Sequence, residues 1–237
     1  AKTAELVAML ADANGWRRET ASRLLFERRD KTAIEPLTKL AAESSSPLAR
    51  MHALYVLDGL NALSPAIVLK GLADKQPHVR QHAVRLAERA ADNSGEVRDK
   101  LLAMVADDNL EVRYQLAFTL GALTDAGRLM ALAALARRDA ADRWVRLAVL
   151  SSLNDGVGEV FAELASDKQF RQSDAGAKML EALALQAGLA HREEDVAAVL
   201  KGLEGLAVDE RRLAETLVRS LGEGLARQGS PLAKLLA

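Results

Sequence analysis

Apolar residues recur three and four positions apart along most of this chain, a spacing that predicts amphipathic helices rather than strands. The pattern is clearest in VRQHAVRLA from Val79, VRYQLAFTL from Val112 and VRLAVLSSL from Val145, and weaker in ARMHALYVL from Ala49 and RRETASRLL from Arg17. Further apolar runs lie between these copies: IEPLTKLAA from Ile34, PAIVLKGLA from Pro65, VRDKLLAMVA from Val97 and RLMALAALA from Arg128. Each copy and the run before it are therefore predicted to form a pair of helices.

The second helix of each predicted pair carries an arginine at the same position. These repeat arginines are Arg18, Arg50, Arg80, Arg113 and Arg146, and they follow one another at intervals of 30 to 33 residues. A period of this length that contains two helices is typical of an α-solenoid, in which each helix pair buries its apolar face against its neighbours. We therefore predict an all-α fold, a right-handed α-solenoid of about six to seven helix pairs, as a single domain over residues 1–237.

An aspartate precedes three of the repeat arginines by six residues. Such an aspartate could cap the second helix, or it could pair with the arginine of a neighbouring repeat, and the sequence leaves both roles open. A row of catalytic carboxylates is disfavoured, because the spacing of these residues follows the structural period. The predicted structural ladder consists of Asp12, Arg18, Arg50, Asp74, Arg80, Asp107, Arg113 and Arg146.

The composition narrows the possible partners and chemistry. With 32 basic and 33 acidic residues the net charge is −1, so we expect no general attraction to nucleic acid. The chain has no cysteine, which excludes disulfides, cysteine metal ligands and thiol nucleophiles. No apolar run is long enough for a transmembrane segment, and no signal peptide is visible at the first residue, so the compartment stays open.

The search for catalytic or metal-binding residues finds no convincing candidate. His52 and His82 occupy the same position in adjacent repeats, where neighbouring helices would hold them roughly 10 Å apart, too far for one metal ion. No serine-hydrolase, phosphate-loop, dinucleotide-binding or metalloprotease motif is present. We therefore predict no catalytic residue, no metal and no cofactor in this chain.

The rare aromatic residues fall at fixed positions of the repeat. Trp16 and Trp144 each lie two residues before a repeat arginine, where we expect hydrophobic staples; stacking on a ligand is the alternative. Tyr55, Tyr114 and Phe118 fall at positions that the repeat leaves unburied. They belong to residue types enriched in protein interfaces, although they could instead fill gaps between helices. The predicted partner-binding residues are Met51, His52, Tyr55, Gln81, His82, Arg85, Tyr114, Gln115 and Phe118.

The aspartate followed by the valine–arginine pattern resembles the HEAT-repeat family, with good matches over residues 12–155. Beyond this range Lys178 and Arg211 keep the spacing of the repeat arginines, but Glu181 and Glu215 stand where the family has apolar residues. We therefore expect degenerate repeats over residues 156–237, with second helices shifted in register. The residues then expected to face inward are Leu180, Leu183, Leu213, Leu217 and Leu221.

Two segments resemble a more specific group of proteins. NGWRRETASRLLFERRD from Asn14 and SPLARMHALYVLDGLNAL from Ser46 are similar to the HEAT-repeat region of large bacterial membrane-bound dehydrogenase-type proteins. In that group a β-propeller precedes the repeats, and a c-type cytochrome domain with a CxxCH motif follows them. This chain contains neither, so the resemblance implies no redox residue here. It implies a spacer or docking module of a larger protein in an extracytoplasmic, periplasmic setting.

The sequence thus predicts a non-catalytic, monomeric scaffold or spacer that binds a protein partner or neighbouring domains of its own chain. One alternative is a stand-alone adaptor protein. The other is a HEAT-like enzyme, either of the DNA glycosylase type or metal-dependent. The near-zero net charge disfavours the first kind of enzyme. The second is disfavoured because HEAT-like metal hydroxylases use His-Glu pairs, and no such dipeptide occurs here.

Overall fold

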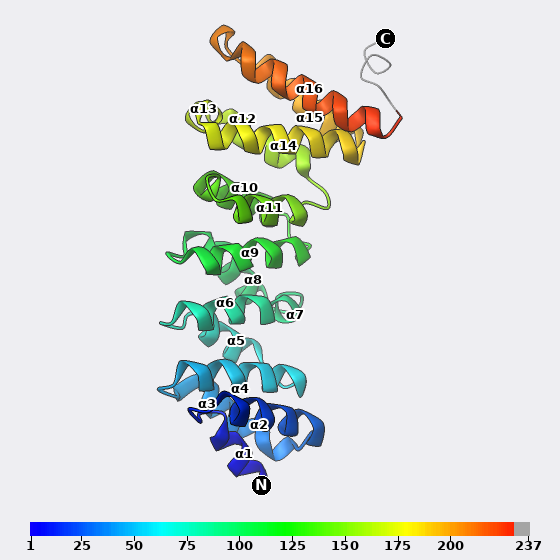
Figure 1. Cartoon of the computed structure of the whole chain (residues 1–237). Coiled ribbons are helices and arrows are strands. Elements are labelled where there is room, and N and C mark those ends of the chain that lie inside the picture. Colours follow the sequence, from blue (N-terminus) through cyan, green and yellow to red (C-terminus); the bar gives the residue numbers. More distant parts are fainter. Residues whose placement is uncertain (230–237) are drawn as a thin grey trace. The chain divides into compact units, whose positions relative to one another are not determined.

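The protein is all-helical, as the apolar spacing predicts. The computed structural model describes residues 1–229, and these contain sixteen α-helices, three short 3₁₀ helices and no strand (Figure 1). Residues 230–237 of the predicted domain lie outside the described part. The chain divides into two compact units, residues 1–119 and residues 120 onward, and the division falls within one helix, α9. Each unit is described by itself.

Unit 1 is built from consecutive pairs of antiparallel helices. Its helices are α1 (Thr3–Met9), α2 (Gly15–Arg28), α3 (Ile34–Glu43), α4 (Pro47–Gly59), α5 (Pro65–Leu72), α6 (Pro77–Leu86), α7 (Glu88–Ala91), α8 (Gly95–Ala103) and the first part of α9 (Leu110–Ala122), with 3₁₀ turns η1 (Lys31–Ala33) and η2 (Met104–Ala106). Within pairs, α1 packs on α2, α3 on α4 and α5 on α6. Between pairs, α2, α4 and α6 are neighbours in one row, and α3, α5 and α8 in another.

Small residues bring the two rows of unit 1 close together. Ala21, Ala53 and Ala83 take the same position on α2, α4 and α6, and none is more than 1% exposed. A Cβ atom added at Gly71 of α5 would lie 2.9 Å from the Cβ of Ala83, so α5 and α6 touch nearly backbone to backbone. The apolar stripe of each second helix is thereby buried against its own first helix, which is where the core of the unit lies.

The second helices of unit 1 begin at residues that suit a helix start. Asn14 and Ser46 accept hydrogen bonds from the amides of Trp16 and Ala49, at the starts of α2 and α4. Helices α4, α5 and α6 begin with a proline, whose missing amide hydrogen would have had no helical partner there. These local signals place each second helix and so set the position of its repeat arginine.

Unit 2 contains longer helices and a less regular arrangement. After the end of α9 it comprises α10 (Gly127–Asp139), α11 (Arg143–Ser152), α12 (Val157–Ser166), α13 (Lys168–Gln172), α14 (Asp174–Ala190), α15 (Glu193–Glu204), η3 (Val208–Glu210) and α16 (Arg211–Arg227). Helix α12 packs on α10, α14 and α15, and α14 packs along α16. Four of the five leucines expected to face inward here are buried, while Leu213 is only partly covered.

After Arg146, which keeps its position, the arginine of the repeat shifts position in unit 2. Lys178 and Arg211, which keep the sequence spacing, are both exposed. Arg171 of α13 instead donates to the carbonyl oxygen of Ala165, six residues earlier, and forms two hydrogen bonds with the buried carboxylate of Glu210. The expectation that Lys178 and Arg211 continue the series is therefore wrong, because the structural role passes to a short helix ahead of α14.

Candidate interaction surface

Two of the repeat arginines in unit 1 bind an aspartate of the following helix pair. Arg50 donates from Nε and Nη2 to the two carboxylate oxygens of Asp74, at 2.6 and 2.7 Å. Arg80 binds Asp107 in the same way, at 2.7 and 2.8 Å. The side chains of Arg50 and Asp74 are 7% and 8% exposed. Planar, two-bond pairs of this kind are the strongest arginine–carboxylate contacts, and here they join one helix pair to the next.

The six-residue spacing between aspartate and arginine comes from a main-chain contact. Each repeat arginine donates from Nη1 to the carbonyl oxygen of the residue six positions before it, as Arg50 does to Ser44 and Arg80 to Asp74. The same contact is made by Arg18, Arg113 and Arg146. The guanidinium thus covers carbonyl groups in the turn before its own helix, and its remaining nitrogens are directed away from that turn.

The aspartates hold the turns rather than cap the second helices. Asp74 and Asp107 accept hydrogen bonds from the amides two residues later, at Gln76 and Asn109. At the start of α9 the cap is the side chain of Asn109. Burial alone raises the pKa of Asp74 and Asp107, but the arginine and amide hydrogen bonds outweigh it and hold each pKa below its ordinary value.

The first member of the predicted ladder is not part of such a pair. Arg18 contacts only main-chain carbonyls of its own turn, and its Nε is buried with no hydrogen-bond partner in the described chain. The following pair has Ser44 where later pairs have aspartate, so no carboxylate is available to Arg18. Asp12 instead binds the exposed side chain of Arg17. The ladder assignment of Asp12 and Arg18 is therefore wrong.

The two tryptophans are not hydrophobic staples. The side chain of Trp16 is 71% exposed and that of Trp144 is 61% exposed. Their amides bind the caps Asn14 and Asp142, which explains their position, but the rings face solvent. The ring of Trp144 lies 5.3 Å from the guanidinium carbon of Arg143. The prediction failed because the neighbouring helix that a staple needs does not cover these rings.

The nine predicted partner-binding residues belong to the consecutive second helices α4, α6 and α9 of unit 1, and we call them the second-helix face. All nine are partly or largely exposed. The hydroxyl of Tyr55 is 2.8 Å from Nδ1 of His82, and their rings meet edge to face. The rings of Tyr114 and Phe118 also meet edge to face, with centroids 5.1 Å apart. The contact between Tyr55 and His82 thus joins neighbouring repeats, whereas the contact between Tyr114 and Phe118 lies within α9.

Helix α9 is held beside α6 at this face. The hydroxyl of Thr119 donates to the main-chain oxygen of Val84 and contacts Oε1 of Glu88 at 3.0 Å. At the other end of the two helices, Arg80 reaches Asp107 and Asp108. The face is therefore continuous across the three helices within unit 1.

Helix α2 extends the second-helix face by residues that the sequence analysis missed. Glu19, Arg23 and Phe26 of α2 line a hollow of about 450 Å³ together with His52 and Tyr55 of α4. Arg23 lies five residues after Arg18, the same position that Tyr55 has after Arg50. This shared position could have predicted that Arg23 belongs to the face. It did not, because the copy of the repeat in α2 is weak.

The two histidines of the face have pKa values below the ordinary value for histidine, which favours the neutral ring. Burial lowers the pKa of His52, and the nearby cation of Arg18 lowers it further. Burial likewise lowers the pKa of His82, with Arg85 adding to the effect. Protonation of either ring would place a partly buried charge beside an arginine.

The free energy of unfolding should therefore decrease as the pH falls below 6.5, the ordinary pKa of histidine. Below that value the unfolded chain takes up protons before the folded one, so the stability due to neutral His52 and His82 is complete above pH 6.5 and is lost as the pH falls through their folded pKa values. Urea denaturation between about pH 8 and about pH 5 measures this change. The free energy of unfolding should depend less on pH in the double variant His52→Gln, His82→Gln than in the wild type. Equal slopes in both proteins would contradict this assignment.

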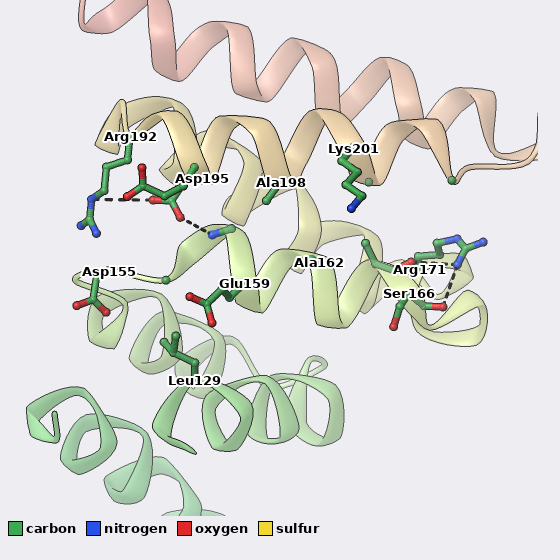
Figure 2. A pocket seen from close by; sticks show the side chains of 16 residues that line it. Leu129, Asp155, Glu159, Ala162, Ser166, Arg171, Arg192, Asp195, Ala198 and Lys201 are labelled. Atoms are coloured by element: carbon green, nitrogen blue, oxygen red, sulfur yellow. Dashed lines mark hydrogen bonds and ion pairs between the residues drawn. The ribbon is translucent and has the colours of Figure 1, made fainter. Parts of the chain in front are cut away.

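A second hollow, of about 930 Å³, lies on unit 2 between α12 and α15 (Figure 2). Small residues such as Ala162 and Ala198 form part of its lining, and Glu159 and Lys201 reach into it from the two helices. Asp195 is only 2% exposed, and its Oδ1 accepts a hydrogen bond from the amide of Gly158 at 2.7 Å. Because the N-cap of α12, Gly156, has no side chain, Asp195 serves as the cap from another helix.

No model of a known family matches the sequence, and no curated protein matches it significantly. In the described residues no group of three or more histidine and acidic side chains is placed to hold a metal ion. Over the same range, no helix has both the length and the apolar character needed to span a bilayer.

Proposed function

We propose that this chain is a HEAT-like α-solenoid that works as a non-catalytic scaffold and binds a protein partner through the second-helix face. The observation that carries the proposal is the set of partly exposed tyrosine, histidine, methionine and arginine side chains on three consecutive second helices. Tyrosine and arginine are among the residues that carry most of the binding energy of protein interfaces, and methionine is enriched there. The charge of −1 and the absence of catalytic motifs support binding rather than chemistry.

The solenoid part of the proposal is supported by the way neighbouring helix pairs are joined. Arg50–Asp74 and Arg80–Asp107 link consecutive pairs of unit 1 through the same two-bond contact. In unit 2, Arg171 and Glu210 form the corresponding contact. Recurrence of one contact at successive pairs is what a stack of repeated helix pairs requires, because each repeat is stabilised by its neighbours.

Replacing both tyrosines of the face by alanine should remove partner binding and leave the fold intact. Each truncation of a central aromatic side chain is expected to weaken binding by about 2 kcal/mol, roughly thirtyfold. The loss of stability should stay at about 2–3 kcal/mol, because the change removes the hydrogen bond between Tyr55 and His82 and the edge-to-face contacts of both rings. The measurement is affinity capture from source cells with the wild-type chain, followed by binding of the captured partner to Tyr55→Ala, Tyr114→Ala.

The matched control is Trp16→Ala, which removes an exposed aromatic ring of unit 1 that lies outside the face. This variant should bind the partner as the wild type does. If the double tyrosine variant keeps the partner, or if Trp16→Ala loses it, the binding surface lies elsewhere.

The setting of the scaffold follows from its resemblance to dehydrogenase-type proteins, and we propose that it is a module of a larger, extracytoplasmic protein. An antibody against this chain tests this on fractionated source cells, paired with a haem stain. A haem-positive band well above 25.5 kDa, outside the cytoplasm, supports the module. A band at 25.5 kDa in the cytoplasm would instead make this chain a stand-alone adaptor.

A further inference from the structure

Guanidinium groups and aromatic rings alternate across unit 1 at a single position of the repeat. Five residues after the repeat arginine, the successive second helices carry Arg23, Tyr55, Arg85 and Phe118. All four side chains are at least partly exposed. Neighbouring members are close: Arg23 and Tyr55 line one hollow, and Tyr55 bonds His82, which lies one helical turn before Arg85. The row therefore presents a charged and an aromatic side chain in turn, with one member on the second helix of each pair.

The charges of this row are available to a partner. In the described chain Arg85 makes no ion pair, and its side chain is exposed. Arg23 pairs only with Glu27 of its own helix, with side chains 64% and 50% exposed, a contact of the weak surface kind. Of the acidic residues beside the row, Asp58 contacts Arg89 and Glu88 contacts Thr119, while Glu19 lines the same hollow as Arg23. An acidic partner would thus meet two arginines without displacing a buried bond.

We propose that the second-helix face, extended by Arg23, binds an extended peptide segment in which acidic and apolar residues alternate. Acidic side chains contact Arg23 and Arg85, and apolar side chains pack on Tyr55 and Phe118. Packed helices lie about 8–10 Å apart, and a segment in the extended polyproline II conformation advances about 3.1 Å per residue with three residues per turn, so roughly three residues pass each helix and every third side chain faces the surface. The segment therefore has the order acidic, two residues, apolar, two residues, acidic, two residues, apolar. This inference rests on the proposed scaffold function and specifies its partner.

A phage-displayed library of random dodecapeptides, selected on the whole chain, tests the spacing and the charge together. Enriched peptides should carry Asp or Glu three residues from an aromatic or aliphatic residue, and their binding should weaken as salt is raised. Selection on Arg85→Glu should enrich lysine or arginine where the wild type selects an acid. The wild-type peptides should bind this variant at least about tenfold more weakly.

The control is Lys70→Glu, which makes the same change of charge on α5, a first helix, at an exposed residue. It should leave the selected peptides unaffected, and circular dichroism should show that both variants fold. Enriched peptides that are basic or purely apolar, or an equal effect of the two variants, would overturn the proposed partner. So would the absence of any enrichment. Loss of peptides only on Tyr55→Ala, Tyr114→Ala, with no acidic preference, would keep the binding face and overturn its specificity alone.

Discussion

Replacing Arg50 by methionine is expected to destabilise unit 1 by about 3–5 kcal/mol, because it leaves the buried carboxylate of Asp74 without its counter-ion. Asp74 is 8% exposed in its side chain and accepts two hydrogen bonds from Arg50. It would keep only the amide of Gln76. The carbonyl oxygen of Ser44 would also lose its donor. Urea denaturation followed by circular dichroism measures the change in the free energy of unfolding.

The second variant, Arg50→Met with Asp74→Leu, removes both charges. It therefore distinguishes the free energy lost with the ion pair from the cost of burying Asp74 without a partner. Removing both charges should recover a large part of the lost stability, since two apolar side chains can replace a buried ion pair at small cost. The matched control is Arg23→Met on α2, whose exposed pair with Glu27 should contribute no more than about 0.5 kcal/mol. A loss below about 1 kcal/mol in Arg50→Met would show that the ladder does not hold the helix pairs together.

Adding one methyl group at Gly224 is expected to cost about 3 kcal/mol or more, at the upper end of the range for overpacked cores. A Cβ atom at this position would lie 2.4 Å from the carbonyl oxygen of Leu185 and 2.8 Å from the amide nitrogen of Leu189. Both atoms belong to the backbone of α14, so no side chain can move aside. The two long helices of unit 2 would have to separate along their contact, which thermal denaturation of Gly224→Ala would detect.

The same helix provides the control for this prediction. Gly222 lies two residues earlier, and a Cβ atom added there meets nothing within 4 Å. Gly222→Ala should therefore stabilise the protein by up to about 1 kcal/mol, through the higher helix propensity of alanine. If the two variants change stability by the same amount and in the same direction, α14 and α16 do not meet at these glycines.

Local helical structure is well determined by the sequence. The spacing of apolar residues locates the second helices, whose shared alanine position, Ala21, Ala53 and Ala83, is buried in the structure. It also shows which positions of each second helix face solvent, and this determined the nine candidate residues of the second-helix face. Both results depend only on the 3.6-residue period, because residues three and four apart share a side of a helix wherever that helix packs.

Contacts between distant segments are decided only by the tertiary structure. Arg18 and Arg50 occupy the same position of the repeat, yet only Arg50 faces a carboxylate, because the next turn has serine in one case and aspartate in the other. Arg171 finds Glu210 across 39 residues, although the sequence spacing pointed to Lys178. A periodic pattern shows that a side chain leaves its helix on a given side, but not which group it meets there.

The sequence by itself thus determined the helical class, the buried stripe of each second helix and the solvent-facing positions, since these are properties of single helices. Tertiary structure alone decided the exposure of Trp16 and Trp144, the capping of α12 by Asp195 and the close crossing at Gly188 and Gly224. Each of these depends on how near a second helix comes and on which of its residues stands opposite. That relation is set by packing in three dimensions and leaves no period in the chain.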